Sequence, residues 1–368
     1  MINQIQPWIN NDEGNYLKKV LQKKYLTEDE ETKKFENNLK KKFKAKNAIA
    51  VSNWTNGIFL LLKAAKIKEG DEVIVPNLTF IATITPIIWA GAIPVLCDVD
   101  RTNSCLDLNK LKKLINKKTR CIIPVHLYGH CCDLSKLFKI IKHKKILIIE
   151  DAAQAMGAKY KSKFLGTIGD MGGFSFYGNK IITTGEGGVM FFKNSKLKNK
   201  IYSLKNHGRS KKGIFKHKTI GYNFMFTEMQ AAVGNIQLKK LNQILKKKEQ
   251  IFNFYRQKLK HIEKIKFLEN LKLNKPVYWF SNIIVENKKS LKNFLFKNGV
   301  QTRDFFFPLS KQPCFKKEKL IKNISSQFPN TDYLYKCGLS LPSSYDLTKK
   351  ELHYIVNIIT EFYAKKKS

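Results

Sequence analysis

The chain has 368 residues, of which 43% are hydrophobic and 26% charged, with 20 glycines and 10 prolines. This is the composition of a globular protein, and it excludes disordered, collagen-like and low-complexity architectures. The formal net charge of +39 raises the question of a nucleic-acid or membrane-surface partner.

Short apolar runs alternate with helical patterns through the first two thirds of the chain. A helix is predicted over Thr32–Lys44, where Phe35, Leu39 and Phe43 share one face. Uninterrupted apolar strands alternating with helices predict an α/β fold, with a buried, mostly parallel sheet covered by helices on both faces. The predicted strands are Ala48–Val51, Glu72–Val75, Ile93–Val99, Cys121–Val125, Ile146–Ile149, Gly173–Phe176 and Gly188–Phe192, with helices at Leu108–Ile115 and Leu134–Lys142.

A long amphipathic helix is predicted to begin at Thr227, because Thr227 and Glu228 suit a helix cap and first turn. The sequence pattern changes after about residue 248, so we predict a large domain over residues 1–247 and a smaller α/β domain over residues 248–368. The smaller domain is expected to contain a strand at Ser281–Glu286 and helices at Leu291–Lys297 and Glu351–Tyr363.

The positive charge comes almost entirely from lysine, since only five of the 68 basic residues are arginine. Proteins that read bases or clamp phosphates favour arginine, because its planar guanidinium binds in a bidentate manner. Lysine is instead spread along the whole chain together with abundant asparagine and isoleucine, and all three have A/T-rich codons. We therefore interpret the charge as a product of gene composition and expect no specific nucleic-acid partner.

The cysteines and the apolar segments predict a cytoplasmic protein. The odd number of cysteines and the absence of a C-x-x-C motif indicate free thiols in a reducing compartment. The N-terminal residues lack the pattern of a signal peptide. Although Val73–Cys97 carries no charge, three prolines interrupt it, so we expect no membrane insertion. The cysteines are Cys97, Cys105, Cys121, Cys131, Cys132, Cys314 and Cys337.

The most informative part of the sequence lies between Ile146 and Phe192. The predicted strand Ile146–Ile149 leads into Glu150 and Asp151, and open α/β sheets bind ligands at the carboxyl ends of their strands. Lys180 differs from the other lysines because, from Met171 to Phe192, only Lys180 and Glu186 are charged. A desolvated lysine has a lowered pKa and can act as a Schiff-base nucleophile.

A carboxylate and a buried lysine suit one cofactor in particular. Pyridoxal phosphate needs a lysine for its aldehyde and a carboxylate for its pyridinium nitrogen. Asp151 and Lys180 fit these two tasks. The alternative is that Asp151 caps a helix and Lys180 lies in a surface turn, and the two residues alone leave both interpretations open.

Two other clusters are weaker candidates. The glycines between Gly166 and Gly173 do not form a dinucleotide-binding motif, because no strand leads directly into a G-x-G-x-x-G turn that opens a helix. A cluster of two histidines and two cysteines lacks a second ligand pair at a finger-like spacing, so we expect no metal site. The members of this cluster are His126, His130, Cys131 and Cys132.

Several longer motifs carry a family resemblance. The segment SFYGNKIITTGEGG, with EDAAQ upstream, resembles the DegT/DnrJ/EryC1/StrS family of pyridoxal-phosphate-dependent nucleotide-sugar aminotransferases. The resemblance covers essentially the full chain and implies a fold-type-I aminotransferase. GNKIITTGEGG and PVHLYG are most similar to the branch that contains GDP-perosamine synthases. Further matching segments are VSNWTNG at 51–57, GDEVIVPNLTFIAT at 70–83, GAIPVLCDVD at 91–100, IIPVHLYGH at 122–130, GYNFMFTEMQAAVG at 221–234 and FFFPLSKQP at 305–313.

The resemblance implies transamination in a homodimer with shared active sites. An amino donor, with glutamate expected, would convert pyridoxal 5'-phosphate to pyridoxamine phosphate, which would then aminate C4 of a nucleotide-linked 4-keto-6-deoxyhexose. Amination at C3, or a UDP- or dTDP-linked sugar, is the alternative among enzymes. A non-catalytic polybasic binding protein on the same fold is the alternative outside them. Loss of Lys180 or Asp151 would favour that last alternative, but both residues are present.

The resemblance also implies roles for individual residues. Lys180 would bind the cofactor aldehyde and then act as the base that moves a proton, and Asp151 would pair with the pyridinium nitrogen. The other implied contacts are Gln154 to the phenolic oxygen, Phe80 and Ala153 on the two ring faces, Ser175, Thr55 and Asn56 to the phosphate, and Asn223 to the phosphate from the neighbouring subunit.

Two residues depart from the family pattern. Trp54 stands where the family most often has glycine, and Ser310 stands where it often has histidine. The first departure puts the phosphate cradle in question, and the second does the same for sugar or donor contacts from that loop. Some relatives carry histidine in place of Lys180 and dehydrate the sugar, whereas this chain keeps the lysine.

Overall fold

A seven-stranded sheet forms the centre of the molecule in the computed structural model, which describes residues 1–210, 213–318 and 320–365. The strand order is β1-β9-β8-β5-β4-β2-β3. β9 runs antiparallel to both of its neighbours, whereas the other pairs are parallel, so the prediction of a mostly parallel sheet is confirmed. The strands are β1 (Ala48–Val51), β2 (Glu72–Pro76), β3 (Ile93–Cys97), β4 (Thr119–Ile122), β5 (Leu147–Asp151), β8 (Met171–Ser175) and β9 (Gly188–Phe192).

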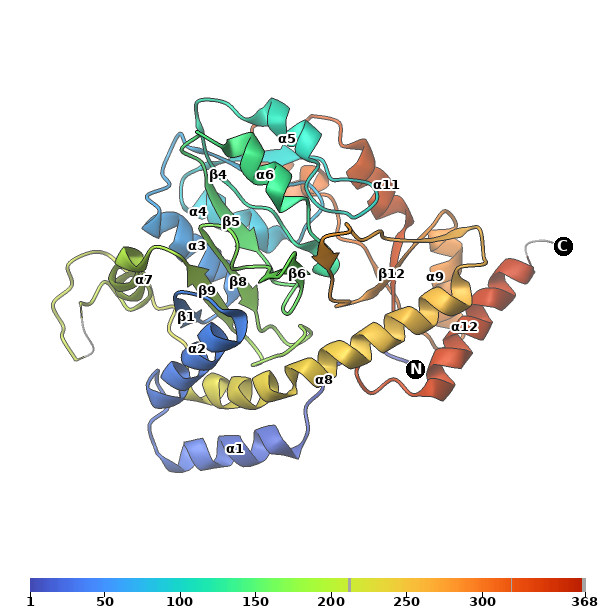
Figure 1. The fold of residues 1–368 in the computed structure, drawn as a ribbon, viewed down its shortest axis with the longest axis horizontal. Coiled ribbons are helices and arrows are strands. Elements are labelled where there is room, and N and C mark those ends of the chain that lie inside the picture. Colours follow the sequence, from blue (N-terminus) through green and yellow to red (C-terminus); the bar gives the residue numbers. More distant parts are fainter. Residues whose placement is uncertain (211–212, 319, 366–368) are drawn as a thin grey trace.

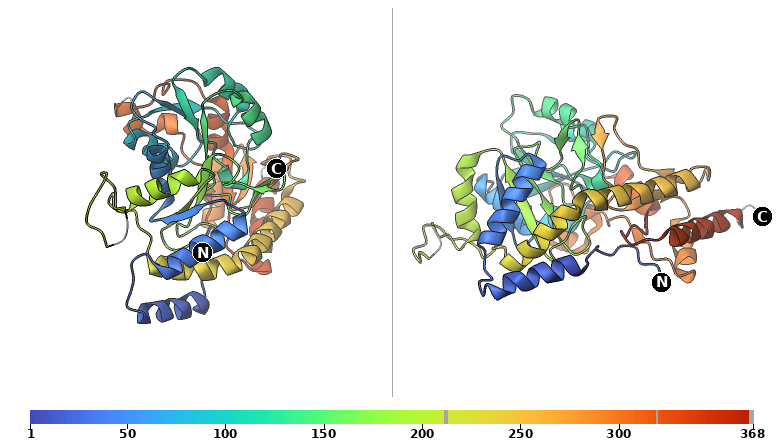
Figure 2. Two further views of the ribbon diagram at one scale, coloured as in Figure 1. Left: turned by 60° about the vertical axis from the view of Figure 1, so that its left-hand side comes forward. Right: turned by 60° about the horizontal axis from the view of Figure 1, so that its bottom comes forward.

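Helices cover both faces of this sheet, which explains why its strands are almost continuously apolar (Figures 1 and 2). Alternate residues of a strand enter opposite cores: Ile148 belongs to the core that includes residues of α2, α5, α6 and α8, and Ile149 belongs to the core that includes residues of α3, α4, α7 and α10. These helices are α2 (Glu30–Phe43), α3 (Trp54–Ala64), α4 (Thr85–Trp89), α5 (Leu108–Leu114), α6 (Leu134–Ile141), α7 (Lys198–Lys205), α8 (Glu228–Leu259) and α10 (Pro313–Glu318).

The long helix α8 begins where the sequence predicts. The Thr227 side chain accepts a hydrogen bond from the Gln230 backbone, and the Gln230 side chain caps the Thr227 backbone in return. α1 (Asn11–Gln22) and α2 pack against its first half (Figure 2). Residues 247 and 248 lie inside this single helix, and the division into two domains at that point stays a prediction.

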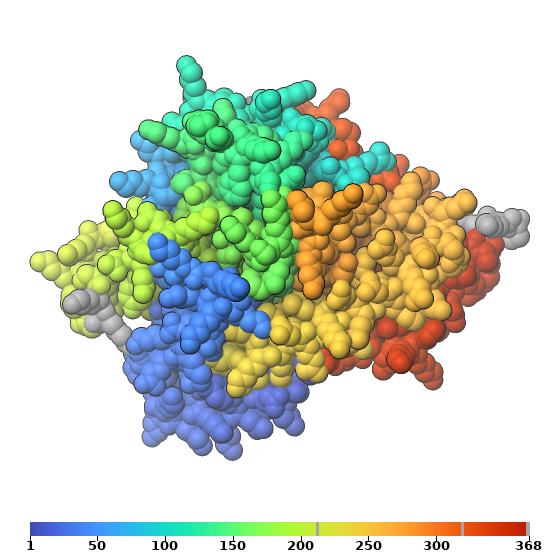
Figure 3. All heavy atoms as spheres, viewed as in Figure 1, coloured from blue at the N-terminus to red at the C-terminus, as the bar shows by residue number. Residues whose placement is uncertain are grey.

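The C-terminal third of the chain, coloured orange to red in Figure 3, builds a second sheet beside the second half of α8 (Figure 1). This four-stranded antiparallel sheet has the order β10-β12-β14-β13 and packs against α8, α9 and α12 around a core of its own. A short three-stranded sheet joins the two parts of the chain in the order β11-β6-β7. The remaining elements are β6 (Lys159–Tyr160), β7 (Lys163–Phe164), β10 (Ile265–Phe267), β11 (Asn274–Lys275), β12 (Ser281–Val285), α9 (Lys288–Lys297), β13 (Arg303–Asp304), α11 (Pro329–Cys337), β14 (Gly338–Leu341) and α12 (Lys349–Ala364).

Two predicted strands of the central sheet, Ala48–Val51 and Gly188–Phe192, have the predicted bounds, and the other five differ at one or both ends. β4 spans Thr119–Ile122, whereas the sequence predicts Cys121–Val125. Pro124, which has no N–H, interrupts the ladder, and Val125 forms only an isolated bridge with Asp151 beyond it. The strand predicted to reach Val99 ends at Cys97. All seven cysteines are free, and among the residues described no helix has the length and apolar character required to cross a membrane.

Candidate active site

A cavity of about 660 Å³ lies where the carboxyl ends of β5 and β8 meet the first turn of α3. It collects residues from distant parts of the chain, including Arg303 and Phe306 from the C-terminal third. Asn223 does not line it: this side chain is exposed, and its backbone pairs with that of Asn206. Eight of the nine predicted site residues do line the cavity, namely Thr55, Asn56, Phe80, Asp151, Ala153, Gln154, Ser175 and Lys180.

Asp151 is the last residue of β5 and its side chain is held from both sides. Oδ1 accepts hydrogen bonds from Trp54 Nε1 at 2.8 Å and from the Ala153 backbone at 3.2 Å. Oδ2 accepts a hydrogen bond from Thr83 Oγ1 at 2.7 Å, and that hydroxyl also lies 3.0 Å from the Thr79 hydroxyl. These donors fix the plane of a buried carboxylate at the wall of the cavity.

Lys180 lies in the turn that follows β8. Its backbone N–H donates to the Tyr177 carbonyl at 2.9 Å, which closes the turn. Its Nζ lies 4.2 Å from the ring centroid of Trp279, and the indole of Trp279 donates to the Asn179 carbonyl at 2.7 Å. Trp279 therefore supports both the lysine turn and the lysine amine from the C-terminal third of the chain.

The Lys180 amine is partly neutral near physiological pH. Burial lowers the pKa of Lys180 to about 8, while the nearby Asp151 carboxylate works against this shift and Arg303 adds to it. Within the described part of the chain no carboxylate forms an ion pair with Nζ. A partly neutral amine that faces a cavity can attack an aldehyde.

Gln154 presents one end of its amide to the cavity. Its Oε1 accepts a hydrogen bond from the Tyr128 backbone at 2.9 Å, and Tyr128 adopts φ 55° in the turn that follows β4. This contact commits the amide oxygen, so the amide nitrogen remains as the donor for an anionic oxygen in the cavity.

The first turn of α3 forms the opposite end of the cavity. Asn53 caps this helix by accepting a hydrogen bond from the Asn56 backbone at 2.9 Å, and the Asn56 side chain donates to Ser52 at 3.0 Å. The first backbone N–H groups of a helix have no partners within it and favour a bound anion. Ser175 ends β8 beside Thr55 in the same lining.

The mouth of the cavity carries exposed aromatic rings. Phe80 is 53% exposed and lies 5.8 Å from Phe306 between ring centroids. Tyr177 and Trp89 line the same opening, with exposed fractions of 49% and 54%. Exposed aromatic faces beside a polar cavity can stack against flat rings of a cofactor or a nucleoside.

These residues fit pyridoxal phosphate. The amine of Lys180 forms no ion pair with a carboxylate of the described chain, and the Asp151 carboxylate faces the same cavity. A helix N-terminus with adjacent hydroxyl and amide side chains suits the phosphate. The geometry is compatible with the cofactor contacts predicted above, and these individual roles remain predictions. The residues concerned are Lys180, Asp151, Gln154, Thr55, Asn56 and Ser175.

Glu150 precedes Asp151 and does a different task. It is buried on the opposite side of β5, where it accepts hydrogen bonds from the backbones of Gly166, Ile168 and Gly169, and its Oε2 lies 2.8 Å from His126 Nε2. Burial works to raise the pKa of Glu150, but the hydrogen bonds from His126 and the backbone outweigh it and lower the pKa. His126 therefore belongs to a structural network, and no group of three or more potential ligands within the described ranges is placed to hold a metal ion.

Ser310, the second departure from the family pattern, is buried away from the cavity lining. It exchanges two hydrogen bonds with the Asn77 side chain, at 3.0 Å from Asn77 Nδ2 to its hydroxyl and 2.8 Å from its backbone to Asn77 Oδ1. This pair ties the segment FFFPLSKQP to the end of β2. Ser310 therefore positions the segment, and the cavity receives Phe306 from it.

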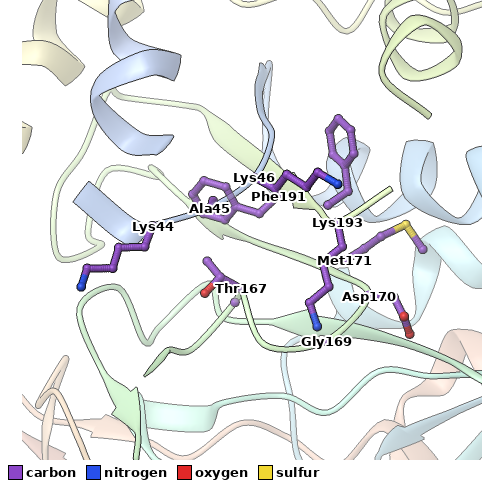
Figure 4. Close-up of a pocket in the computed structure, with 11 residues that line it drawn as sticks. Lys44, Ala45, Lys46, Thr167, Gly169, Asp170, Met171, Phe191 and Lys193 are labelled. Carbon is purple, nitrogen blue, oxygen red and sulfur yellow. The ribbon is translucent and has the colours of Figure 1, made fainter. Parts of the chain in front are cut away.

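A smaller hollow of about 210 Å³ lies elsewhere on the sheet, between the end of α2 and the turns that flank β8 (Figure 4). Two of its charged groups, Asp170 and Lys193, are used in structural contacts. Asp170 Oδ2 accepts a hydrogen bond from the Ile148 backbone at 2.9 Å, and Lys193 Nζ donates to the Ile168 carbonyl at 2.6 Å. This hollow lacks the combination of free amine, carboxylate and helix N-terminus that marks the larger cavity.

The comparisons with known proteins agree with this site. The model of the DegT/DnrJ/EryC1/StrS aminotransferase family matches residues 7–360. The chain belongs to this family. It is 34% identical to the GDP-perosamine synthase of Escherichia coli O157:H7, over 98% of each chain, and 31% identical to that of Vibrio cholerae, over 99% of each chain.

A solved structure gives the same fold. Spr1654 from Streptococcus pneumoniae, in its PMP-form, superposes with a TM-score of 0.93 at 24% identity, over 99% of this chain and 100% of that one. The family model and the relatives confirm the expected pyridoxal-phosphate-dependent sugar aminotransferase.

Sequence reasoning missed four contributors to the site. The sequence marked Trp54 only as a departure, and gave no role to Thr83, Trp279 or Arg303. Thr83 has a local signal, because it ends the matching segment GDEVIVPNLTFIAT. Trp279 and Arg303 lie about a hundred residues from Lys180, where no local pattern connects them with the site.

Proposed function

We propose that this aminotransferase transfers an amino group from an amino acid, with glutamate as the expected donor, to C4 of a GDP-linked 4-keto-6-deoxyhexose. The observation that carries the proposal is the retained Lys180, which faces a cavity shared with Asp151 in a chain similar along its length to two GDP-perosamine synthases. The reaction exchanges the amine of the donor for the keto oxygen of the sugar. It is therefore balanced without any oxidant.

The residues of the chain divide the work between binding and proton transfer. When bound, pyridoxal phosphate supplies an electron sink that acidifies the C–H bond beside the reacting nitrogen. Asp151 holds a proton at the ring nitrogen, because its carboxylate is fixed at the cavity wall by Trp54 and Thr83. Lys180 Nζ takes the proton from the donor's α-carbon and, in the second half of the cycle, gives one to C4 of the sugar.

Arg303 and the aromatic rings suit the nucleotide part of the substrate. Arg303 is the one arginine among the residues that line the cavity of the described chain, and a guanidinium binds phosphate oxygens in a bidentate manner. Trp89 exposes a ring face at the opening, where a base can stack, whereas Phe80 is assigned to the cofactor ring. The free cysteines and a nucleotide-linked substrate favour a cytoplasmic location.

A panel of keto-sugar nucleotides tests the substrate. GDP-, UDP- and dTDP-linked 4-keto-6-deoxysugars are incubated with the protein, pyridoxal phosphate and glutamate, and the products are identified by mass spectrometry and NMR. We expect an amino group at C4 of the GDP-sugar together with 2-oxoglutarate. Preferred amination at C3, or of a UDP- or dTDP-sugar, would replace the proposed substrate, and no product with any of them would overturn the function.

We further propose that the active unit is a homodimer with sites built across the interface. Residues 213–220, between α7 and α8, extend from the body of the molecule (Figure 1) and expose three large apolar side chains. Ile214, Phe215 and Ile220 are 41%, 78% and 89% exposed. Apolar groups on an extended segment favour burial against a second chain, which would bring Asn223 to the neighbour's site.

Mixing two inactive variants tests the shared site. Lys180→Ala and Asn223→Asp lie in different sites if Asn223 serves the neighbour, so a mixed dimer has one doubly damaged site and one intact site. The aspartate weakens cofactor binding, because it places a negative charge beside the phosphate. With random subunit exchange we expect about a quarter of native activity to return.

Subunit exchange is verified separately by mass spectrometry of differently tagged chains. Two Lys180→Ala preparations, mixed in the same way, serve as the control and should stay inactive. No recovery despite proven exchange would show that each site is built within one chain.

A further inference from the structure

The indole of Trp54 lies within the cofactor site, at the position where the family most often has glycine. Trp54 is the first residue of α3, is 4% exposed, and donates its Nε1–H to Asp151 Oδ1 at 2.8 Å. A buried indole N–H requires an acceptor, and the structure provides the one carboxylate that the cofactor ring needs. The side chain is therefore connected directly to the chemistry of the site.

Two glycines provide the space for this indole. A Cβ atom at Gly173 on β8 would lie 2.2 Å from Cζ3 of Trp54, and one at Gly57 on α3 would lie 2.8 Å from Cε3. Both distances are shorter than any normal contact between carbon atoms. The indole thus occupies a slot between strand and helix that any side chain at Gly173 would block.

The donors to Asp151 leave it little freedom. A carboxylate offers about four lone-pair sites, and Trp54, the Ala153 backbone and Thr83 already use three of them. Because the donors approach both oxygens, rotation of the carboxylate would break at least one of these bonds. One acceptor site remains for a further donor from the cavity.

We propose that Trp54 is a positioning residue: its N–H locks the Asp151 carboxylate so that the remaining lone pair meets the ring nitrogen of pyridoxal phosphate. The proposal rests on cofactor binding in this cavity and does not depend on the identity of the sugar. Thr83 performs the same task from the other oxygen. Trp54 and Thr83 therefore act on one group and should be energetically coupled.

Trp54→Phe tests the proposal, because phenylalanine keeps an aromatic ring in the slot and removes the N–H. Apoprotein is titrated with pyridoxal phosphate alone, and both the dissociation constant and the pH midpoint of the absorbance change of the bound cofactor are recorded. We expect about a tenfold weaker affinity, the effect of one hydrogen bond to a charged group, and a shifted pH midpoint. Trp8→Phe, which alters a ring stacked on Tyr345, is the control and should change neither value.

Three further variants separate positioning from packing. Thr83→Val should weaken binding as Trp54→Phe does, Thr83→Ser should restore it, and the double variant Trp54→Phe/Thr83→Val should lose less than the sum of the single losses. Unchanged affinity and pH midpoint in Trp54→Phe, or strict additivity with Thr83→Val, would overturn the proposal and leave Trp54 as a packing residue.

The native protein provides a test that needs no folded Trp54 variant. The chain has four tryptophans, so its ¹⁵N-labelled form gives four indole N–H signals, of which Trp8→Phe, Trp89→Phe and Trp279→Phe identify three. The remaining signal should be protected from exchange and should shift when pyridoxal phosphate is added. A signal that exchanges freely and ignores the cofactor would contradict the proposal.

Discussion

Lys180 and Lys248 both have a pKa well below the ordinary value for lysine, yet they occupy contrasting surroundings. Burial lowers the pKa of Lys180 to about 8 and that of Lys248, on α8, to about 7. Lys248 Nζ donates to the carbonyls of Trp279 and Ser343 at 3.1 and 2.9 Å, whereas Lys180 Nζ faces a cavity of about 660 Å³. Trp279 contacts both, because its carbonyl accepts from Lys248 and its ring lies beside Lys180.

The contrast shows that desolvation alone does not make a nucleophile. Lys248 has the lower pKa, but its amine donates hydrogen bonds to two carbonyls, and Lys248 does not line the cavity. Lys180 combines a lowered pKa with open space, a nearby carboxylate and a helix N-terminus for an anion. Reactivity at Lys180 therefore depends on what surrounds the amine as well as on its burial.

Replacing Lys180 should reduce turnover far more than replacing Lys248. Lys180→Ala is expected to reduce turnover by at least about a thousandfold, because the group that binds the cofactor aldehyde and moves the proton is lost. Its thermal unfolding should remain close to native, since the amine forms no hydrogen bond that supports the fold among the residues described. Lys248→Met is the matched control and should keep measurable transamination. Near-native turnover in Lys180→Ala would break the distinction between the two lysines.

The carboxylate side of the site can be tested with Asp151→Asn. Asparagine keeps the shape and can still accept from Trp54, but a neutral amide cannot hold a proton at the ring nitrogen. We expect the variant to retain pyridoxal phosphate, seen by its absorbance, while the transamination rate falls by about two or more orders of magnitude. Unchanged kinetics would mean that another acid serves the ring nitrogen.

The smallest expected effect concerns stability at Lys248. Because its folded pKa is about 7, against an ordinary value of 10.5, the folded protein has released a proton that the unfolded chain still holds between these pH values. The free energy of unfolding should therefore rise with pH across this window, by at most about 1.4 kcal/mol per pH unit. Below about pH 7 both forms hold the proton and the dependence should vanish.

The Lys248→Met variant lacks this titration. The titration of Lys180 changes the free energy of unfolding equally in the native protein and in the variant. The difference between the native and Lys248→Met unfolding energies, measured by urea denaturation from pH 7 to 10, isolates the effect. Parallel curves for the two proteins would show that Lys248 is not desolvated as the structure indicates.

Local chemistry made much of the fold predictable. The helix that starts after Thr227 was predictable because its capping box is formed by neighbours in sequence. The strand β4 ends earlier than predicted because the apolar run beyond Ile122 includes Pro124, and hydropathy does not register a missing N–H. An apolar pattern therefore locates a buried strand but does not by itself show where its hydrogen-bonded ladder stops.

The site divides in the same way. Asp151 and Lys180 stand out within one window because the surrounding residues are uncharged or small. The hydrogen bond from Trp54 to Asp151 joins residues 97 apart, and the contact of Lys180 with Trp279 depends on how the C-terminal third packs on the sheet. Such contacts arise from tertiary packing and leave no periodic pattern in the sequence.

The network of Glu150 has a consequence for the accuracy of β5. Adjacent residues of a strand face opposite sides, so a slip by one position would place either Glu150 at the cavity or Asp151 at the loop at 166–169, and so exchange the side that this acid faces. Glu150 resists this exchange, because three backbone donors and His126 fit it where it stands. Glu150 does not line the cavity, yet its hydrogen bonds fix the register of β5 to within one residue. They thereby determine which of the two acids reaches the cofactor.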